Sequence, residues 1–115
     1  MMISVPIRTA RGQNAREHYM QRARRVKAER VAVGLMLNLH KPPQGLVTVL
    51  LRRVSPSNKG LDSDNLVGSM KAPRDQIAQW LGRDDADPSI TWLYQQRPGK
   101  KGEWAVEIEV EVNHA

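Results

Sequence analysis

Apolar and polar residues alternate along the last part of the chain, which is the pattern of β-strands with one buried face. In residues 103–112 three glutamates separate the apolar positions, which are Val106, Ile108, Val110 and Val112. Residues 89–96 and 46–54 are rich in β-branched, leucine and aromatic side chains, so they also predict strands. The "RPGKKG" segment between the last two strands is typical of a hairpin turn. We therefore expect these two strands to pair, and we expect the Glu107, Glu109 and Glu111 row to be a solvated sheet face.

The N-terminal part predicts a short strand followed by a long helix. Residues 2–8 alternate around Pro6, and a proline restricts a strand to the edge of a sheet. Residues 15–39 are rich in helix-forming side chains, and Asn14 is a candidate N-cap. One mostly apolar stripe recurs at spacings of three and four residues and consists of Tyr19, Ala23, Val26, Arg30 and Val33.

A second helix is predicted over residues 65–81, where the apolar stripe is Leu66, Met70, Ile77 and Leu81. Pro73 conflicts with a continuous helix because it removes a hydrogen bond and clashes with the carbonyl of Ser69. The helix is therefore expected either to kink there or to end a first turn near Ala72 and restart at Pro73. Gly82 is expected to follow the helix as its C′ residue.

These elements predict an α+β fold in the order β-α-β-α-β-β, with one mixed sheet and two helices. A chain of 115 residues suits one domain, and we expect a single domain over 1–115. The chain has no cysteine, which excludes disulfides, thiolate zinc sites and a cysteine nucleophile. We expect neither a membrane-spanning segment nor a secretory signal, because no apolar run approaches the required ~20 residues.

Positive charge is concentrated at the start of the chain. Residues 1–30 contain eight basic and two acidic residues, whereas residues 31–115 contain ten of each. The whole net charge of +6 therefore comes from the first quarter of the sequence. A basic segment of this kind favours binding to a polyanion, of which nucleic acid is the commonest.

All aspartates of the chain lie within residues 60–88; they are Asp62, Asp64, Asp75, Asp84, Asp85 and Asp87. In an extended segment, Asp62 and Asp64 would point to the same side, and paired carboxylates can hold a hard cation such as Mg²⁺. A straight helix over 65–81 would be ~25 Å long. Asp85 can then approach Asp62 only if the helix is short or bent, or if the chain returns along the sheet.

Structural roles explain the same residues equally well. Asp64 or Asn65 can cap the helix. Lys71 and Asp75 are spaced as an i, i+4 surface ion pair, and residues 83–88 can form a solvated turn. Spacing alone leaves the metal site and these structural roles open.

The segment "LDSDNLVGSMKAPRDQIAQWLGRDD" resembles the RusA-type Holliday-junction resolvases, in particular the short phage- and prophage-borne members. The shared pattern is D-x-D-N-L, then a lysine, an R-D pair, a helix and finally D-D. The segment "ITWLYQQ…GEWAVEIEV" is similar to that family's closing hairpin, so that the resemblance covers roughly 46–112. It implies a Mg²⁺-dependent homodimeric endonuclease, with Mn²⁺ able to substitute, that cleaves four-way DNA junctions in recombination and repair in the cytoplasm of a bacterial host.

The resemblance also implies roles for particular residues. Asp62, Asp64 and Asp85 correspond to the metal-binding and catalytic aspartates, and Asp84 is a possible substitute for Asp85. Lys71 corresponds to the catalytic lysine if a short insertion is allowed; an ungapped alignment reaches Gly68 instead. Asn65 is expected to cap or orient. The expected contacts to DNA backbones are made by Arg16, Arg22, Arg25, Lys27, Arg52, Arg53 and Lys59.

Two alternative functions remain at this point. One is a metal-dependent nuclease that acts on other branched replication intermediates. The other is a non-catalytic DNA-binding protein whose aspartates only cap helices and solvate turns.

Overall fold

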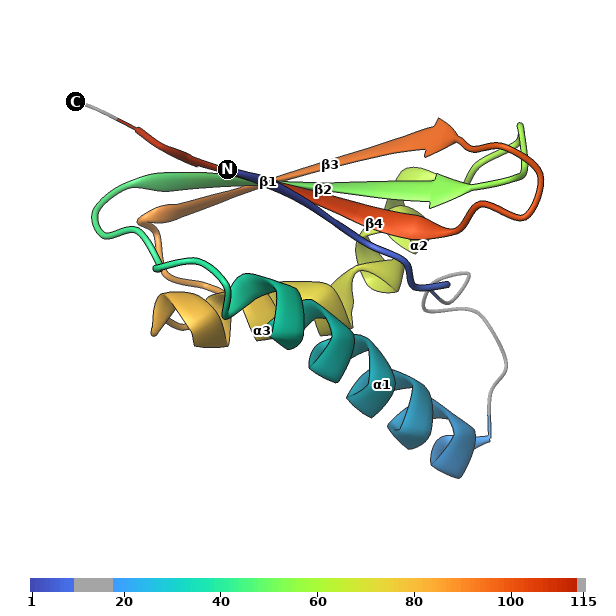
Figure 1. The fold of residues 1–115 in the computed structure, drawn as a ribbon, viewed down its shortest axis with the longest axis horizontal. Coiled ribbons are helices and arrows are strands. Elements are labelled where there is room, and N and C mark those ends of the chain that lie inside the picture. Colours follow the sequence, from blue (N-terminus) through green and yellow to red (C-terminus); the bar gives the residue numbers. More distant parts are fainter. Residues whose placement is uncertain (10–17, 114–115) are drawn as a thin grey trace.

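The computed structural model describes residues 1–9 and 18–113 of the chain, and Figure 1 shows their arrangement. The described elements are β1 (Met2–Val5), α1 (Tyr19–Leu37), β2 (Val47–Ser55), α2 (Ser63–Ser69), α3 (Lys71–Leu81), β3 (Ile90–Pro98) and β4 (Ala105–Val112). The expected α+β fold with one mixed sheet is confirmed. The described part has three helices rather than two, because the second predicted helix is divided.

The four strands lie in the order β1-β4-β2-β3, with β2 parallel to β3 and antiparallel to β4. The predicted hairpin between β3 and β4 is therefore wrong, because the chain passes from one edge of β2 to the other. The physical reason lies in β2, which is largely buried and needs a partner on both edges. β4 supplies buried Val106 and Ile108 as well as glutamates that pair with Arg52 of β2.

The helices cover one face of the sheet, so that the molecule has two layers (Figure 1). Alternate positions of the strands point into the space between the layers. They form the core with buried side chains of the helices: Ile3, Val5, Val33, Leu37, Val47, Val49, Leu51, Leu66, Met70, Ile77, Leu81, Ile90, Val106, Ile108 and Val110. Trp80 and Trp92 are partly buried and pack against this core.

The break between α2 and α3 falls at Met70, whose φ of −97° and ψ of 6° leave the helical range. Pro73 then lies in the first turn of α3, where a missing N–H removes no helical hydrogen bond. The restart that the proline predicted is thus present, but it begins with Lys71. Gly82 ends α3 with a φ of +71°, as predicted for a C-terminal glycine.

Among the described residues, the buried side chains of helix α1 lie in its C-terminal half. Val33 and Leu37 are fully buried, whereas Tyr19 is 75% exposed, so the predicted stripe is buried only in part. Figure 1 shows the N-terminal half extending away from the sheet. His18 caps this end by accepting a hydrogen bond from the Met20 amide through Nδ1. The predicted cap Asn14 lies outside the described residues.

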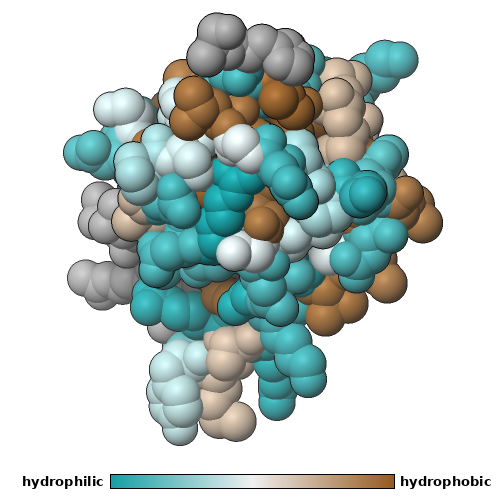
Figure 2. All heavy atoms as spheres, turned by 90° about the vertical axis from the view of Figure 1, so that its left-hand side faces the viewer, coloured by the Kyte–Doolittle hydropathy of each residue, from teal (hydrophilic) through white to brown (hydrophobic). Residues whose placement is uncertain are grey.

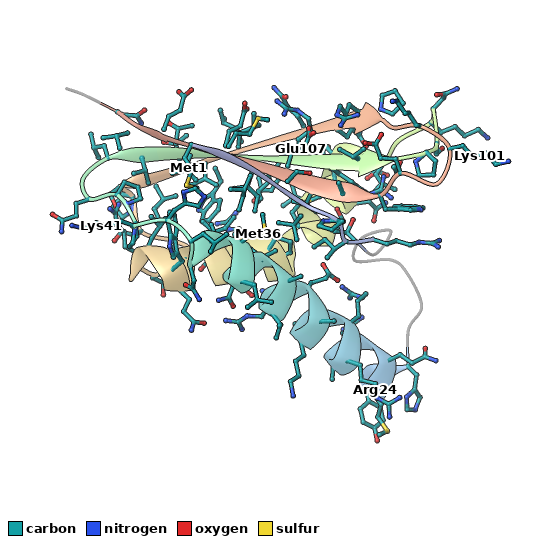
Figure 3. All side chains as sticks on the ribbon, viewed as in Figure 1. Met1, Arg24, Met36, Lys41, Lys101 and Glu107 are labelled. Atoms are coloured by element: carbon teal, nitrogen blue, oxygen red, sulfur yellow. The ribbon has the colours of Figure 1, made fainter. Side chains whose placement is uncertain are left out.

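The other face of the sheet is polar and points away from the helices, as the labelled Glu107 illustrates in Figure 3. Its charges are paired, because Arg52 lies 3.2 Å from Glu107 and 3.3 Å from Glu109. Figure 2 views the molecule from the left of Figure 1 and shows a mostly hydrophilic surface with apolar groups at its upper edge and along its right-hand side. None of the described helices is long and apolar enough to cross a membrane.

Candidate functional site

The first acidic segment, residues 61–65, is fixed to the end of β3 by a side chain of that strand. The Gln96 Oε1 atom accepts a hydrogen bond from the Leu61 amide at 2.8 Å, and its Nε2 donates to the Leu61 carbonyl at 2.7 Å. Gly60 precedes this contact with a φ of +65°, and a Cβ atom there would lie 2.8 Å from Gln96 Oε1. The turn therefore depends on a residue without a side chain.

Asp62 is the N-cap of α2. Its Oδ1 accepts from the Asn65 amide at 2.9 Å and its Oδ2 accepts from Asn65 Nδ2 at 3.1 Å. Asp64 already lies in the first helical turn and is exposed. The extended geometry that would place both carboxylates on one side is therefore not found. An aspartate does cap this helix, but the cap is Asp62 rather than Asp64 or Asn65.

The second acidic segment follows Gly82 and turns back toward β3. Asp84 Oδ1 accepts from the Ala86 amide at 2.8 Å, and Asp87 accepts from the amide and hydroxyl of Ser89. These two bonds from Ser89 hold the pKa of Asp87 below its ordinary value. The Asp85 carbonyl accepts from Trp92 Nε1 at 2.9 Å, which ties the loop to the middle of β3.

Arg74 connects the second acidic segment to β3. Its guanidinium lies 4.7 Å from the centre of the Trp92 ring and donates to the Tyr94 hydroxyl at 2.6 Å and to the Asp85 carbonyl at 3.2 Å. Its Nε lies 3.2 Å from Asp85 Oδ2 without hydrogen-bond alignment, so this contact is an ion pair. Asp85 is thereby partly neutralised by a residue of α3.

The two acidic segments lie on the same face of the same strand, but they do not meet. One is anchored at Gln96 and the other at Trp92, and four residues of a strand span about 13 Å. Arg74 reaches Tyr94, which lies between these two positions. Within residues 1–9 and 18–113, no group of three or more acidic or histidine side chains is arranged to hold a metal ion. The predicted cluster of Asp62, Asp64 and Asp85 is therefore not assembled.

Lys71 is the first residue of α3 and its side chain is 81% exposed. Its Nζ lies 3.9 Å from Asp75 Oδ2, which is the i, i+4 ion pair considered from the sequence. An exposed pair of this kind contributes only a few tenths of a kcal/mol. The lysine is therefore free to exchange Asp75 for another anion.

The proposed DNA-contacting residues fall into different environments. Arg22 and Lys27 are exposed on α1, and Lys59 is exposed in the loop before Gly60. Arg25 lies 2.6 Å from Glu29, whose side chain is almost fully buried. Arg16 lies outside the described residues.

The two arginines of β2 point to opposite faces of the sheet. Arg52 is engaged by Glu107, Glu109 and Gln95 on the polar face. Arg53 is only 5% exposed and donates to Thr9 and Ser55 on the helix side. Arg52 is thus an ion-paired residue, and Arg53 is almost fully buried, so neither is a freely exposed cation.

Sequence reasoning missed two residues that organise this region: Arg74 and Gln96. In the sequence, Arg74 appeared only as part of the R-D pair, and Gln96 appeared only as the last residue of a predicted strand. The available signal was the alternation of Trp92, Tyr94 and Gln96, which predicts that polar tips of these side chains share one face of β3. Their partners come from distant segments, which no local pattern identifies.

Comparisons with known proteins add no family to this description. The chain matches no family model and no curated protein. The resemblance to the RusA-type resolvases therefore stays a prediction that rests on the quoted motifs.

Proposed function

We propose that this protein is a divalent-metal-dependent, structure-selective DNA endonuclease that cuts phosphodiester bonds at four-way junctions. The single observation that carries the proposal is that both acidic segments of the motif are anchored to one face of β3. An exposed lysine at the start of α3 and a basic helix accompany them. This combination of carboxylates and cations suits a phosphate-containing substrate.

Two of the predicted carboxylates, rather than three, are placed so that they could hold Mg²⁺ together. Asp62 and Asp64 offer only oxygen atoms, both are exposed, and they lie within one turn of each other. Magnesium is commonly held by one or two carboxylates, with substrate phosphates and water as the other ligands. Asp85 does not join this pair while Arg74 neutralises it, and Asp84 is engaged with the Ala86 amide.

The residues of the chain then have distinct parts in cleavage. When bound, the metal lowers the pKa of a coordinated water and offsets charge on the scissile phosphodiester. Lys71 stabilises negative charge that develops on the phosphate, because its ammonium group is held only by a weak surface pair. Asn65 orients Asp62 through two hydrogen bonds.

The test is a cleavage assay on labelled four-way junctions, flaps and linear duplex, with Mg²⁺, Mn²⁺ or EDTA. We expect metal-dependent cutting of the junction and little cutting of the linear duplex. Asp64→Asn should lower the cleavage rate by at least ~100-fold and leave junction binding intact. Asp87→Asn is the matched control, since its carboxylate is engaged by Ser89 outside the proposed site. Full activity of Asp64→Asn would refute the assignment.

A non-catalytic DNA-binding protein is the second candidate. The observation that favours it is that Asp62 caps α2 and Asp85 pairs with Arg74, so both carboxylates have structural partners. Junction binding without cutting in every metal tested would select this function. Equal cutting of flaps and junctions would instead select a nuclease with broader structure selectivity.

The resemblance also leads us to propose a homodimer, in which two copies act on the two symmetric strands of a junction. Light scattering of the free protein and of its junction complex measures the number of copies. A monomer in both states would contradict this part of the proposal.

A further inference from the structure

Two arginines converge on one tryptophan at the end of the sheet where β2 finishes. The Arg8 guanidinium lies 4.4 Å from the centre of the Trp104 ring, and that of Arg53 lies 5.6 Å from it. Arg8 is exposed, whereas Arg53 is almost fully buried. An aromatic ring stabilises one cation, but two cations beside it also repel each other.

Among residues 1–9 and 18–113, no carboxylate forms an ion pair with Arg53. Its Nε donates to the Thr9 hydroxyl at 3.3 Å and its Nη1 donates to the Ser55 hydroxyl at 3.2 Å, and both acceptors are neutral. Among the described residues no hydrogen bond from Nη2 is found, and Nη2 is not one of the fully buried atoms that lack a partner. Within the described part of the chain, Nη2 therefore has no acceptor. Burial and the neighbouring Arg8 lower the pKa of Arg53.

Three other arginines that lie against the sheet are placed differently. Each has an acidic partner within ion-pair distance: Arg52 with Glu107 and Glu109, Arg74 with Asp85, and Arg97 with Glu103 and Glu107. A buried charge without a partner is costly. Among the described residues, the pair of Arg8 and Arg53 lacks an anion of the kind that these three arginines possess.

The position of this pair relates it to the first acidic segment. Arg53 lies directly opposite Gln96 in the β2–β3 register, so their side chains share the helix-side face and neighbouring strands are ~4.8 Å apart. Gln96 in turn holds Leu61, the residue before Asp62. Arg53 therefore lies one strand away from the residue that holds the turn before Asp62.

We propose that Arg8 and Arg53 form a phosphate-binding site at Trp104. The phosphate belongs either to a nucleic-acid backbone or to a free oligophosphate, because both present the same oxygen acceptors to a guanidinium fork. Arg8 supplies the exposed donors and Arg53 supplies Nη2, while Trp104 keeps the Arg8 side chain in place. The site does not require the proposed nuclease activity, although in a nuclease it would bind a phosphate close to Asp62.

The test uses the Trp104 indole N–H as a reporter in NMR spectra of the full chain, with its signal assigned through Trp104→Phe. Wild-type protein, Arg8→Gln and Lys41→Gln are titrated with inorganic pyrophosphate and, separately, with a short DNA duplex, all at constant ionic strength. Lys41→Gln removes the same charge at the opposite end of the molecule from Lys101, as Figure 3 shows. Arg8 is exposed, so its replacement leaves the core unchanged.

We expect a saturable shift of the Trp104 signal in wild type and Lys41→Gln, with about tenfold weaker binding in Arg8→Gln. Saturation by DNA at lower concentration than by pyrophosphate identifies a nucleic-acid phosphate, and the reverse order identifies a free oligophosphate. No shift with both ligands, or equal affinity of Arg8→Gln and wild type, overturns the site. A shift in a protein that cuts no junction would refute the nuclease and leave the phosphate site standing.

Discussion

Asp62 combines two roles that a single substitution can separate. As the N-cap of α2 it accepts from the Asn65 amide, and as an exposed carboxylate it is a candidate metal ligand. Asparagine is as good an N-cap as aspartate, whereas alanine is not. The charge can therefore be removed without removing the cap.

We expect Asp62→Asn to keep the stability of the protein within about 0.5 kcal/mol and Asp62→Ala to lose about 1 kcal/mol. Both variants should lose junction cleavage, because neither carries the carboxylate. Urea denaturation and the cleavage assay measure the two effects on the same samples. Cleavage by Asp62→Asn at the wild-type rate would leave the residue with its capping role alone.

Glu107 makes the sheet sensitive to acid. Its side chain is 14% exposed, and hydrogen bonds from Arg97 and Arg52 lower its pKa below the ordinary glutamate value. The unfolded chain therefore binds the proton more readily than the folded one. The stabilisation is present above pH ~5 and is lost as the pH falls through the lowered pKa.

Glu107→Gln should accordingly lower the free energy of unfolding by about 1 kcal/mol at neutral pH, and the difference from wild type should shrink toward pH 3. Urea denaturation at both pH values measures it. The control is Glu111→Gln, which removes an exposed member of the same row. A difference that is independent of pH would contradict the assigned pKa shift.

At the scale of elements, the turn before α2 tolerates a side chain at its glycine less well than the turn after α3. Gly60 and Gly82 have similar positive φ angles of +65° and +71°, but a Cβ atom would collide with Gln96 only at Gly60. An alanine at either position is strained by its backbone. Only at Gly60 does it also displace the side chain that anchors the first acidic segment.

We therefore expect Gly82→Ala to cost about 1 kcal/mol and to leave cleavage unchanged. Gly60→Ala should cost more and also reduce junction cleavage, because Leu61 loses its fixed position. Thermal unfolding and the cleavage rate, measured for both variants, provide the comparison. If the two variants cleave equally well, the Gln96 contact is not needed to position Asp62.

The elements themselves were largely predictable, because their signals are local. The apolar pattern predicted the bounds of β2, β3 and β4 to within one or two residues. Pro73 indicated that a helix restarts near it, and Gly82 indicated where α3 ends. The strand order was not predictable, since the "RPGKKG" turn looks the same whether its flanking strands pair or enclose a third. The contact of Leu61 with Gln96 and the ion pair of Asp85 with Arg74 depend on how separate elements pack, so the motif identified the aspartates but not the distance between them in the fold.

At the scale of the whole molecule, the excess positive charge is carried by the first 30 residues, and the described part of it lies mainly on α1. Arg22 and Lys27 are exposed there, whereas Arg25 is paired with the buried Glu29. Each backbone phosphate contact contributes about 0.9 to the slope of log affinity against log salt concentration. The number of phosphate contacts made by α1 can therefore be measured from the salt dependence of binding.

Replacing Arg22 and Lys27 together by glutamine should weaken junction binding and reduce the salt slope by about 1.8, if each contacts one phosphate. Fluorescence anisotropy at several salt concentrations measures the slope. Lys41→Gln, which lies beyond the C-terminal end of α1, should change it little. An unchanged slope in the double variant would exclude these two residues from the DNA contact.

The N-terminal half of α1, which extends away from the sheet in Figure 1, also has a consequence for the protein's internal motions. A helix end that buries few apolar side chains frays readily, because isolated helical turns are marginal in water. Amide protons near Tyr19 should therefore exchange with solvent far sooner than those near Val33 and Leu37, which are sealed against the sheet. A polyanion bound along the N-terminal half of α1 would suppress this fraying, so binding would be accompanied by a local coil-to-helix transition.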